Sequence, residues 1–146
     1  MDSNTIYPPF LKAEDEWMKT NIQELGNGVY QLTTPFLTPH NDYIELYIRP
    51  MPEKYEEQKS EAFYILSDDG QTLADIYMQG GDIGTETNQI TIKKLQESYG
   101  FSIEENEALE LQTSEKDFTR QKSRLLQAII SLQALFMDMK EEYASA

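Results

Sequence analysis

The chain has 146 residues, and its 26 acidic and 12 basic side chains give a formal net charge of −14 at neutral pH. This charge repels the phosphates of nucleic acids and anionic lipid headgroups, which argues against direct binding to either. The absence of cysteine excludes disulfides, thiolate metal sites and a cysteine nucleophile. With 39% hydrophobic residues, the length predicts one folded domain over 1–146. No signal peptide or membrane-spanning run is evident, so we expect a cytoplasmic protein.

The first predicted element is a helix within residues 1–28. Pro8 and Pro9 suit the start of a helix, because the first turn needs no N–H donor. Apolar residues then recur at helical spacing, and Gly26 is expected to end the helix. The apolar positions are Leu11, Met18, Ile22 and Leu25.

Residues 29–112 are predicted to form a small antiparallel sheet with two inserted helices. β-Branched and aromatic residues alternating with polar ones predict about four strands, at 29–33, 42–49, 63–66 and 108–112. Residues 34–41 contain two prolines, which cannot donate to a strand ladder, and so predict an ordered loop. Helices are expected over 71–79, ended by Gly80 and Gly81, and over about 87–99, ended by Gly100.

The segment 113–146 is predicted to be one long C-terminal helix, so the fold class is α+β with helices packed on the sheet. Ser114 is expected to cap this helix, with Asp117 three residues later. The helix is apolar over more than one face, which leaves open either deep burial or a homodimer through a second face. That candidate dimer face consists of Leu126, Ile130 and Met137.

Three runs of residues carry a resemblance to a known family. They are Thr-Thr-Pro-Phe-Leu at 33–37, His-Asn-Asp-Tyr-Ile at 40–44 and Leu-Ser-Asp-Asp-Gly-Gln-Thr-Leu at 66–73. Together they resemble the uncharacterised bacterial and phage family catalogued as domain of unknown function 1828, over about residues 17–136. The resemblance implies a prokaryotic or viral setting, and it brings no established reaction and no catalytic residues.

One group of residues predicts a divalent metal site. Its members are expected at the start of the second strand and the end of the third, which lie side by side if these strands form a hairpin. Such a site would hold Mg²⁺ or Mn²⁺ and activate water for phosphodiester hydrolysis. The alternative is that the histidine orders its loop while the two aspartates of the turn before Gly70 cap backbone N–H groups. The candidate ligands are His40, Asp42, Glu45, Asp68 and Asp69.

Acidic residues also gather in two groups along the chain. If they were spaced like duplex phosphates, they could compete for the basic groove of a restriction or CRISPR enzyme. The alternative is that they lie on solvated loops. The groups are Glu53, Glu56, Glu57 and Glu61, and Glu104, Glu105 and Glu107.

We therefore expect a non-enzymatic, acidic protein-interaction module without a cofactor, whose partner is another protein. Its specific form would be inhibition of a nucleic-acid-processing defence enzyme by polyanion mimicry, of the anti-restriction or anti-CRISPR type. The alternative function is a metal-dependent phosphodiesterase or nuclease that uses His40, Asp42, Glu45 and Asp68 with Mg²⁺ or Mn²⁺.

Overall fold

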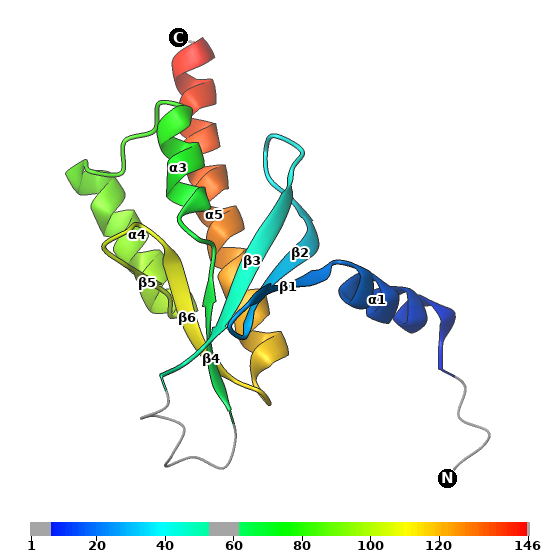
Figure 1. Ribbon diagram of the computed structural model, residues 1–146. Helices are drawn as coiled ribbons and strands as arrows, with labels where there is room; N and C mark the ends of the chain where they lie inside the picture. The colour runs from blue at the N-terminus through cyan, green and yellow to red at the C-terminus, as the bar shows by residue number, and fades with distance from the viewer. Residues whose placement is uncertain (1–6, 53–61, 146) are drawn as a thin grey trace.

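A computed structural model describes residues 7–52 and 62–145 of the chain, with the backbone alone described from residue 137 onward. It has an α+β fold, in which α5 runs along the sheet and contacts β4 and β6, while α3 and α4 pack against α5 (Figure 1). In chain order the elements are α1 (Pro9–Thr20), β1 (Ile22–Gly26), β2 (Val29–Leu37), β3 (Tyr43–Pro50), β4 (Phe63–Ser67), α3 (Gln71–Met78), α4 (Glu86–Tyr99), β5 (Ser102–Ile103), β6 (Leu109–Ser114) and α5 (Phe118–Ser145).

Within the described residues the sheet has six strands in the order β1-β2-β3-β4-β6-β5, and each pair of neighbours is antiparallel. The antiparallel sheet and the C-terminal helix confirm the predicted fold class, but the prediction of about four strands was too low. The two additional strands are β1, whose five residues are all exposed, and β5, which has only two residues. Neither carries the alternation of buried and exposed residues by which a strand is recognised in a sequence.

The predicted N-terminal helix is shorter than expected, because the chain leaves the helix at Asn21. The Asn21 side-chain nitrogen donates to the carbonyl of Trp17 at 3.0 Å, and its backbone N does so at 2.9 Å. Asparagine competes in this way for helix backbone groups and favours helix ends. Ile22 and Leu25 therefore lie on β1, not on a helical face.

The turn between β1 and β2 consists of Asn27 and Gly28, both with positive φ, at 56° and 75°. This is the Asn-Gly pair that two-residue hairpins prefer, because positive φ at both positions matches the twist of the strands. The dipeptide was the sequence signal for the β1–β2 hairpin, and the helical spacing of the preceding apolar residues obscured it.

The segment 34–41, predicted as a loop, forms the end of β2 as far as Leu37. Pro35 lies within an irregular stretch, where the β2–β3 register shifts between Thr33 and Leu37. There Thr34 Oγ1 donates to the carbonyl of Ile44 at 2.8 Å. A bulge is one of the places where a strand tolerates proline, because no ladder donor is needed.

Most helix ends lie where the sequence predicts them. Gly80 N donates to Tyr77 O at 3.0 Å and Gly81 N to Ile76 O at 2.9 Å, the Schellman pattern that closes α3. Gly100 follows α4 in the left-handed conformation. The expected start of α5 needs correction: Ser114 is the last residue of β6, and its Oγ accepts from Asp117 N at 3.2 Å, so the helix begins only at Phe118.

The wide apolar surface of α5 is used within the protein. Leu126, placed in the candidate dimer face, is 4% exposed and belongs to the core, whereas Ile130 is 38% exposed. The side chain of Met137 lies outside the described residues, so the homodimer stays a prediction. Each buried leucine or isoleucine contributes about 1.5–3 kcal/mol to the free energy of unfolding. The buried residues of α5 include Leu125, Leu126, Ala128, Ile129, Leu132 and Phe136.

Within the described ranges, none of the helices combines the length and apolar character that crossing a bilayer requires.

Candidate functional site

β3 extends beyond its neighbour β4, so among the described residues the first half of β3 has no strand partner on that side. Pairing between the two strands begins at Tyr47, opposite Ser67, because the chain then turns out of the sheet into α3. Figure 1 shows the β2–β3 hairpin diverging from α3 above this point. The carbonyl of Ile44 faces β2, where it accepts from Thr34. Since successive residues of a strand alternate their hydrogen-bonding side, Glu45 N–H and C=O face the open edge.

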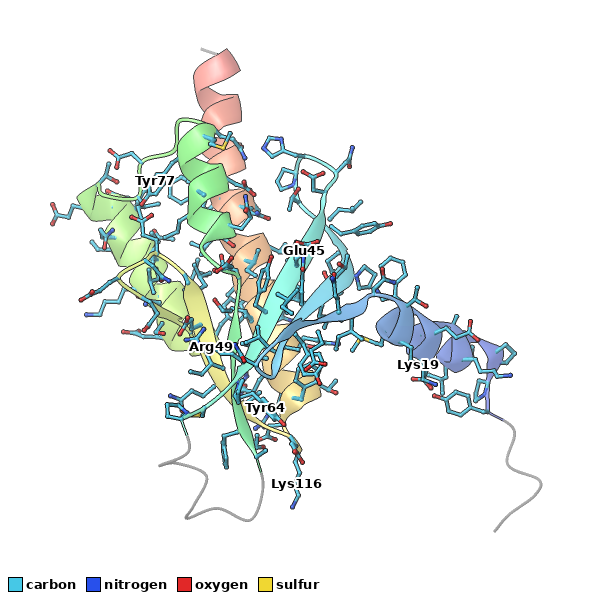
Figure 2. All side chains as sticks on the ribbon, in the orientation of Figure 1. Lys19, Glu45, Arg49, Tyr64, Tyr77 and Lys116 are labelled. Carbon is cyan, nitrogen blue, oxygen red and sulfur yellow. The ribbon has the colours of Figure 1, made fainter. Side chains whose placement is uncertain are left out.

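A pocket of about 450 Å³ lies at this open edge. β3 forms one wall, and the turn after β4 and the start of α3 form another. Ile129 and Gln133 of α5 also line it. Figure 2 shows Glu45 on the diverging half of β3 and Arg49 farther down the strand, where β4 lies beside it. The polar lining residues are Thr33, Thr38, Asp42, Tyr43, Glu45, Tyr47, Asp68, Gln71, Thr72, Asp75 and Gln133.

Asp68 fixes the wall between β4 and α3. The residue is 2% exposed. Its Oδ1 accepts from the backbone N of Gly70 at 2.9 Å and of Leu109 at 2.8 Å, and its Oδ2 accepts from Thr72 N at 2.9 Å. Three backbone donors therefore use both carboxylate oxygens, as expected if Asp68 is a turn and capping residue.

The five predicted metal ligands do not converge. His40 lies on an exposed loop, where its Nε2 is 2.8 Å from Nε2 of Gln79 after α3. Asp69 is exposed and sits in the turn with φ 58°. Asp42, Glu45 and Asp68 share the pocket, but among the described residues no three histidine, cysteine, aspartate or glutamate side chains are placed to hold a metal ion. Asp68 uses both carboxylate oxygens for backbone donors, and spacing in the sequence does not reveal this.

The pocket has an acidic lining without a counter-charge, since none of the described residues that line it is lysine, arginine or histidine. Asp75 Oδ1 accepts from Gln71 Nε2 at 2.7 Å. The carboxylates of Asp42 and Glu45 form no hydrogen bond or ion pair with any described residue. An approaching cation would therefore meet negative charge on two walls.

Tyr47 adds a hydrogen-bond donor to the pocket. Burial raises the pKa of its hydroxyl above 10.0, and the negative charges of Glu45 and Asp69 raise it further. The phenol therefore keeps its proton throughout the physiological range. Tyr43, at the same open edge, makes an edge-to-face contact with Trp17, with ring centroids 5.4 Å apart.

Gln133 is one of the site residues that no pattern in the sequence selected. Its side chain is 6% exposed and lines the pocket, yet it makes no hydrogen bond within the described chain. Buried amides are normally hydrogen-bonded, and leaving one without a partner costs about 1–3 kcal/mol. The available signal was a polar residue beside Leu132 on the buried side of a helix that is otherwise apolar there.

The predicted acidic groups are only partly described. Glu104, Glu105 and Glu107 are exposed around the turn between β5 and β6. Glu107 accepts from the hydroxyl of Tyr77 at 3.3 Å. The other group, Glu53, Glu56, Glu57 and Glu61, lies outside the described residues.

The family model for the domain of unknown function DUF1828 matches residues 34–132, about two thirds of the chain. The chain belongs to this family. The resemblance inferred from the sequence is therefore confirmed, over a shorter span than 17–136. The DUF1828 match runs from β2 into α5, so it contains both walls of the pocket and ends one residue before Gln133. No curated protein and no solved structure matches the chain.

Proposed function

We propose that this DUF1828 protein is a non-enzymatic module that binds another protein, and that the pocket at the open edge of β3 belongs to its binding surface. The observation that supports this function is the pocket lining, in which Asp42, Glu45 and Asp75 meet no basic residue of the described chain. A protein partner supplies basic side chains and also backbone groups that can pair with a free strand edge. Phosphate-bearing partners are repelled by the same lining.

The specific form of this function is inhibition of a nucleic-acid-processing defence enzyme in a bacterial or phage setting. The formal charge of −14 and the exposed Glu104, Glu105 and Glu107 favour contact with a basic, DNA-binding groove. Occupation of that groove would displace DNA without any reaction on the protein itself.

The general function is tested by cross-linking in the cells that encode the protein. A photoreactive amino acid replaces Thr38, which lines the pocket, or Gln127, which is exposed on α5. We expect a covalent adduct with one protein from position 38 only, which Glu45→Gln reduces, and binding of that purified partner to the wild-type protein. Adducts that do not depend on position, or on Glu45, would argue against the proposal.

The specific form is tested with purified restriction and CRISPR nucleases. Size-exclusion chromatography with light scattering at low and high salt should detect a complex that weakens as salt increases, and the nuclease should lose DNA binding in parallel. The absence of a complex at every salt concentration removes the inhibitor form and leaves the general function to the cross-linking experiment.

A further inference from the structure

The pocket contains a buried group that has no hydrogen-bond partner among the residues that the structure describes. The Gln133 amide has one acceptor oxygen and two N–H donors. It is 6% exposed, lines the pocket and makes no hydrogen bond within the described chain. A molecule that enters the pocket and bonds this amide would therefore satisfy a group that the fold leaves unsatisfied.

The negative charges around the pocket favour a cation as the ligand of this amide. Asp42 and Glu45 have no ion pair within the described residues, and Asp75 lies on the opposite wall. The guanidinium of arginine has five N–H donors in a planar fork, which can bond a carboxylate in a bidentate manner and still donate to an amide oxygen. Tyr43 and Tyr47 also line the pocket, and aromatic side chains attract planar cations.

The open edge of β3 favours an extended polypeptide as the molecule that bears this cation. Glu45 N–H and C=O face the space that β4 would fill if it continued beyond Ser67. An extended segment in that space can pair with Glu45 as an added strand, the mode by which many domains bind peptides. Alternate side chains of such a strand point to opposite faces, so one in two can enter the pocket.

We infer that the partner presents an extended segment carrying an arginine, whose backbone pairs with the free edge of β3 at Glu45 and whose guanidinium enters the pocket lined by Asp42, Glu45 and the Gln133 amide. This inference rests on the proposed function and names the chemistry of its partner. It assigns separate roles to the strand edge, which binds backbone, and to the pocket, which selects charge.

The test uses the full chain and short capped peptides of threonine and valine with one central arginine. The matched control peptide has citrulline in place of arginine, which keeps the shape and hydrogen-bonding urea but removes the charge. A third peptide carries N-methyl groups on the backbone that would face Glu45. Binding is measured by calorimetry and by the fluorescence of Trp17, the single tryptophan of the chain, which contacts Tyr43 at the pocket.

We expect the arginine peptide to bind at least about 10-fold more tightly than the citrulline and N-methylated peptides, because charge-assisted bonds and backbone pairing are each lost. Glu45→Gln and Gln133→Leu should each weaken binding of the arginine peptide by about 10-fold. Glu97→Gln, an equal change of charge at an exposed position of α4 outside the pocket, should leave it within about 2-fold. Thermal unfolding of each variant verifies that it is folded.

Equal affinity for the arginine and citrulline peptides would overturn the inference, since charge would not be selected. Free arginine that binds as tightly as the peptide would also overturn it, by showing a small-molecule guanidinium site. If neither peptide binds but the cross-linked partner does, the inference fails while the proposed function stands. If the purified partner fails as well, the proposed function fails with it.

Discussion

Asp68 Oδ1 accepts a hydrogen bond from Leu109 N at 2.8 Å, although the two residues are 41 positions apart. In return, Leu109 O accepts from Asp68 N at 3.2 Å. This pair joins the turn after β4 to the start of β6, and so it fixes the place where the chain leaves the sheet. The open edge of β3 exists because the chain leaves there, and the pocket depends on the same pair.

Replacement of Asp68 should therefore weaken the fold more than its charge alone suggests. In Asp68→Asn, one acceptor oxygen becomes an N–H donor facing a backbone N–H such as that of Thr72, and we expect the free energy of unfolding to fall by about 2–3 kcal/mol. Urea denaturation measures the change. Asp69→Asn is the matched control, because Asp69 is exposed and asparagine tolerates its positive φ, so it should change stability by less than about 0.5 kcal/mol. Equal effects would show that Asp68 does not organise the turn.

Replacement of Gln133 should stabilise the protein, in contrast to replacement of Asp68. Gln133→Leu removes a buried amide that has no partner in the described part of the chain and keeps a similar volume, so we expect the free energy of unfolding to rise by about 1 kcal/mol. Thermal and urea unfolding both measure this rise. Gln127→Leu, on the exposed side of α5, should remain within about 0.5 kcal/mol of the wild type. A loss of stability in Gln133→Leu would mean that the amide has a partner in the free protein.

Gly81 is required by close packing at the end of α3. A Cβ atom there would lie 2.6 Å from Cγ2 of Ile76 and 3.0 Å from Cδ1 of Phe136. We expect Gly81→Ala to lower the free energy of unfolding by about 1–3 kcal/mol, since both neighbours are buried in the core. Gly84→Ala is the control, because its nearest neighbour is an Asp82 carboxylate oxygen at 3.2 Å that can move. Similar unfolding midpoints for both variants would exclude this packing argument.

The raised pKa of Tyr47 predicts a loss of stability at alkaline pH. Burial, and then Glu45 and Asp69, favour the protonated phenol in the folded state, so the folded pKa exceeds the unfolded value of about 10.0. This contribution is fully present below pH 10 and is lost as the pH rises through the folded pKa. Tyr47→Phe should therefore show a smaller decrease in the free energy of unfolding between pH 9 and 11, measured by urea denaturation. An unchanged decrease would show that Tyr47 does not contribute.

The end of α1 and the predicted metal site show which contacts cannot be predicted from neighbouring residues in the sequence. The Asn21 side chain donates to the carbonyl of Trp17 and ends α1. The prediction extended the helix to Gly26 because apolar residues continue at helical spacing after Asn21. The predicted metal site involves a contact of a different kind. Asp68 is held by a backbone N–H from a strand 41 residues away, and no spacing near Asp68 reports that contact.

By itself, the sequence determined the α+β class, the family, the glycine ends of α3 and α4, and the long apolar helix α5. These features depend on contacts within a few residues or on a periodic pattern, and both are present in the chain before it folds. Only the tertiary structure decided the pocket. It requires β4 to end before β3 does and Gln133 of α5 to lie beneath the gap, and such long-range pairing is set by the packing of the whole core.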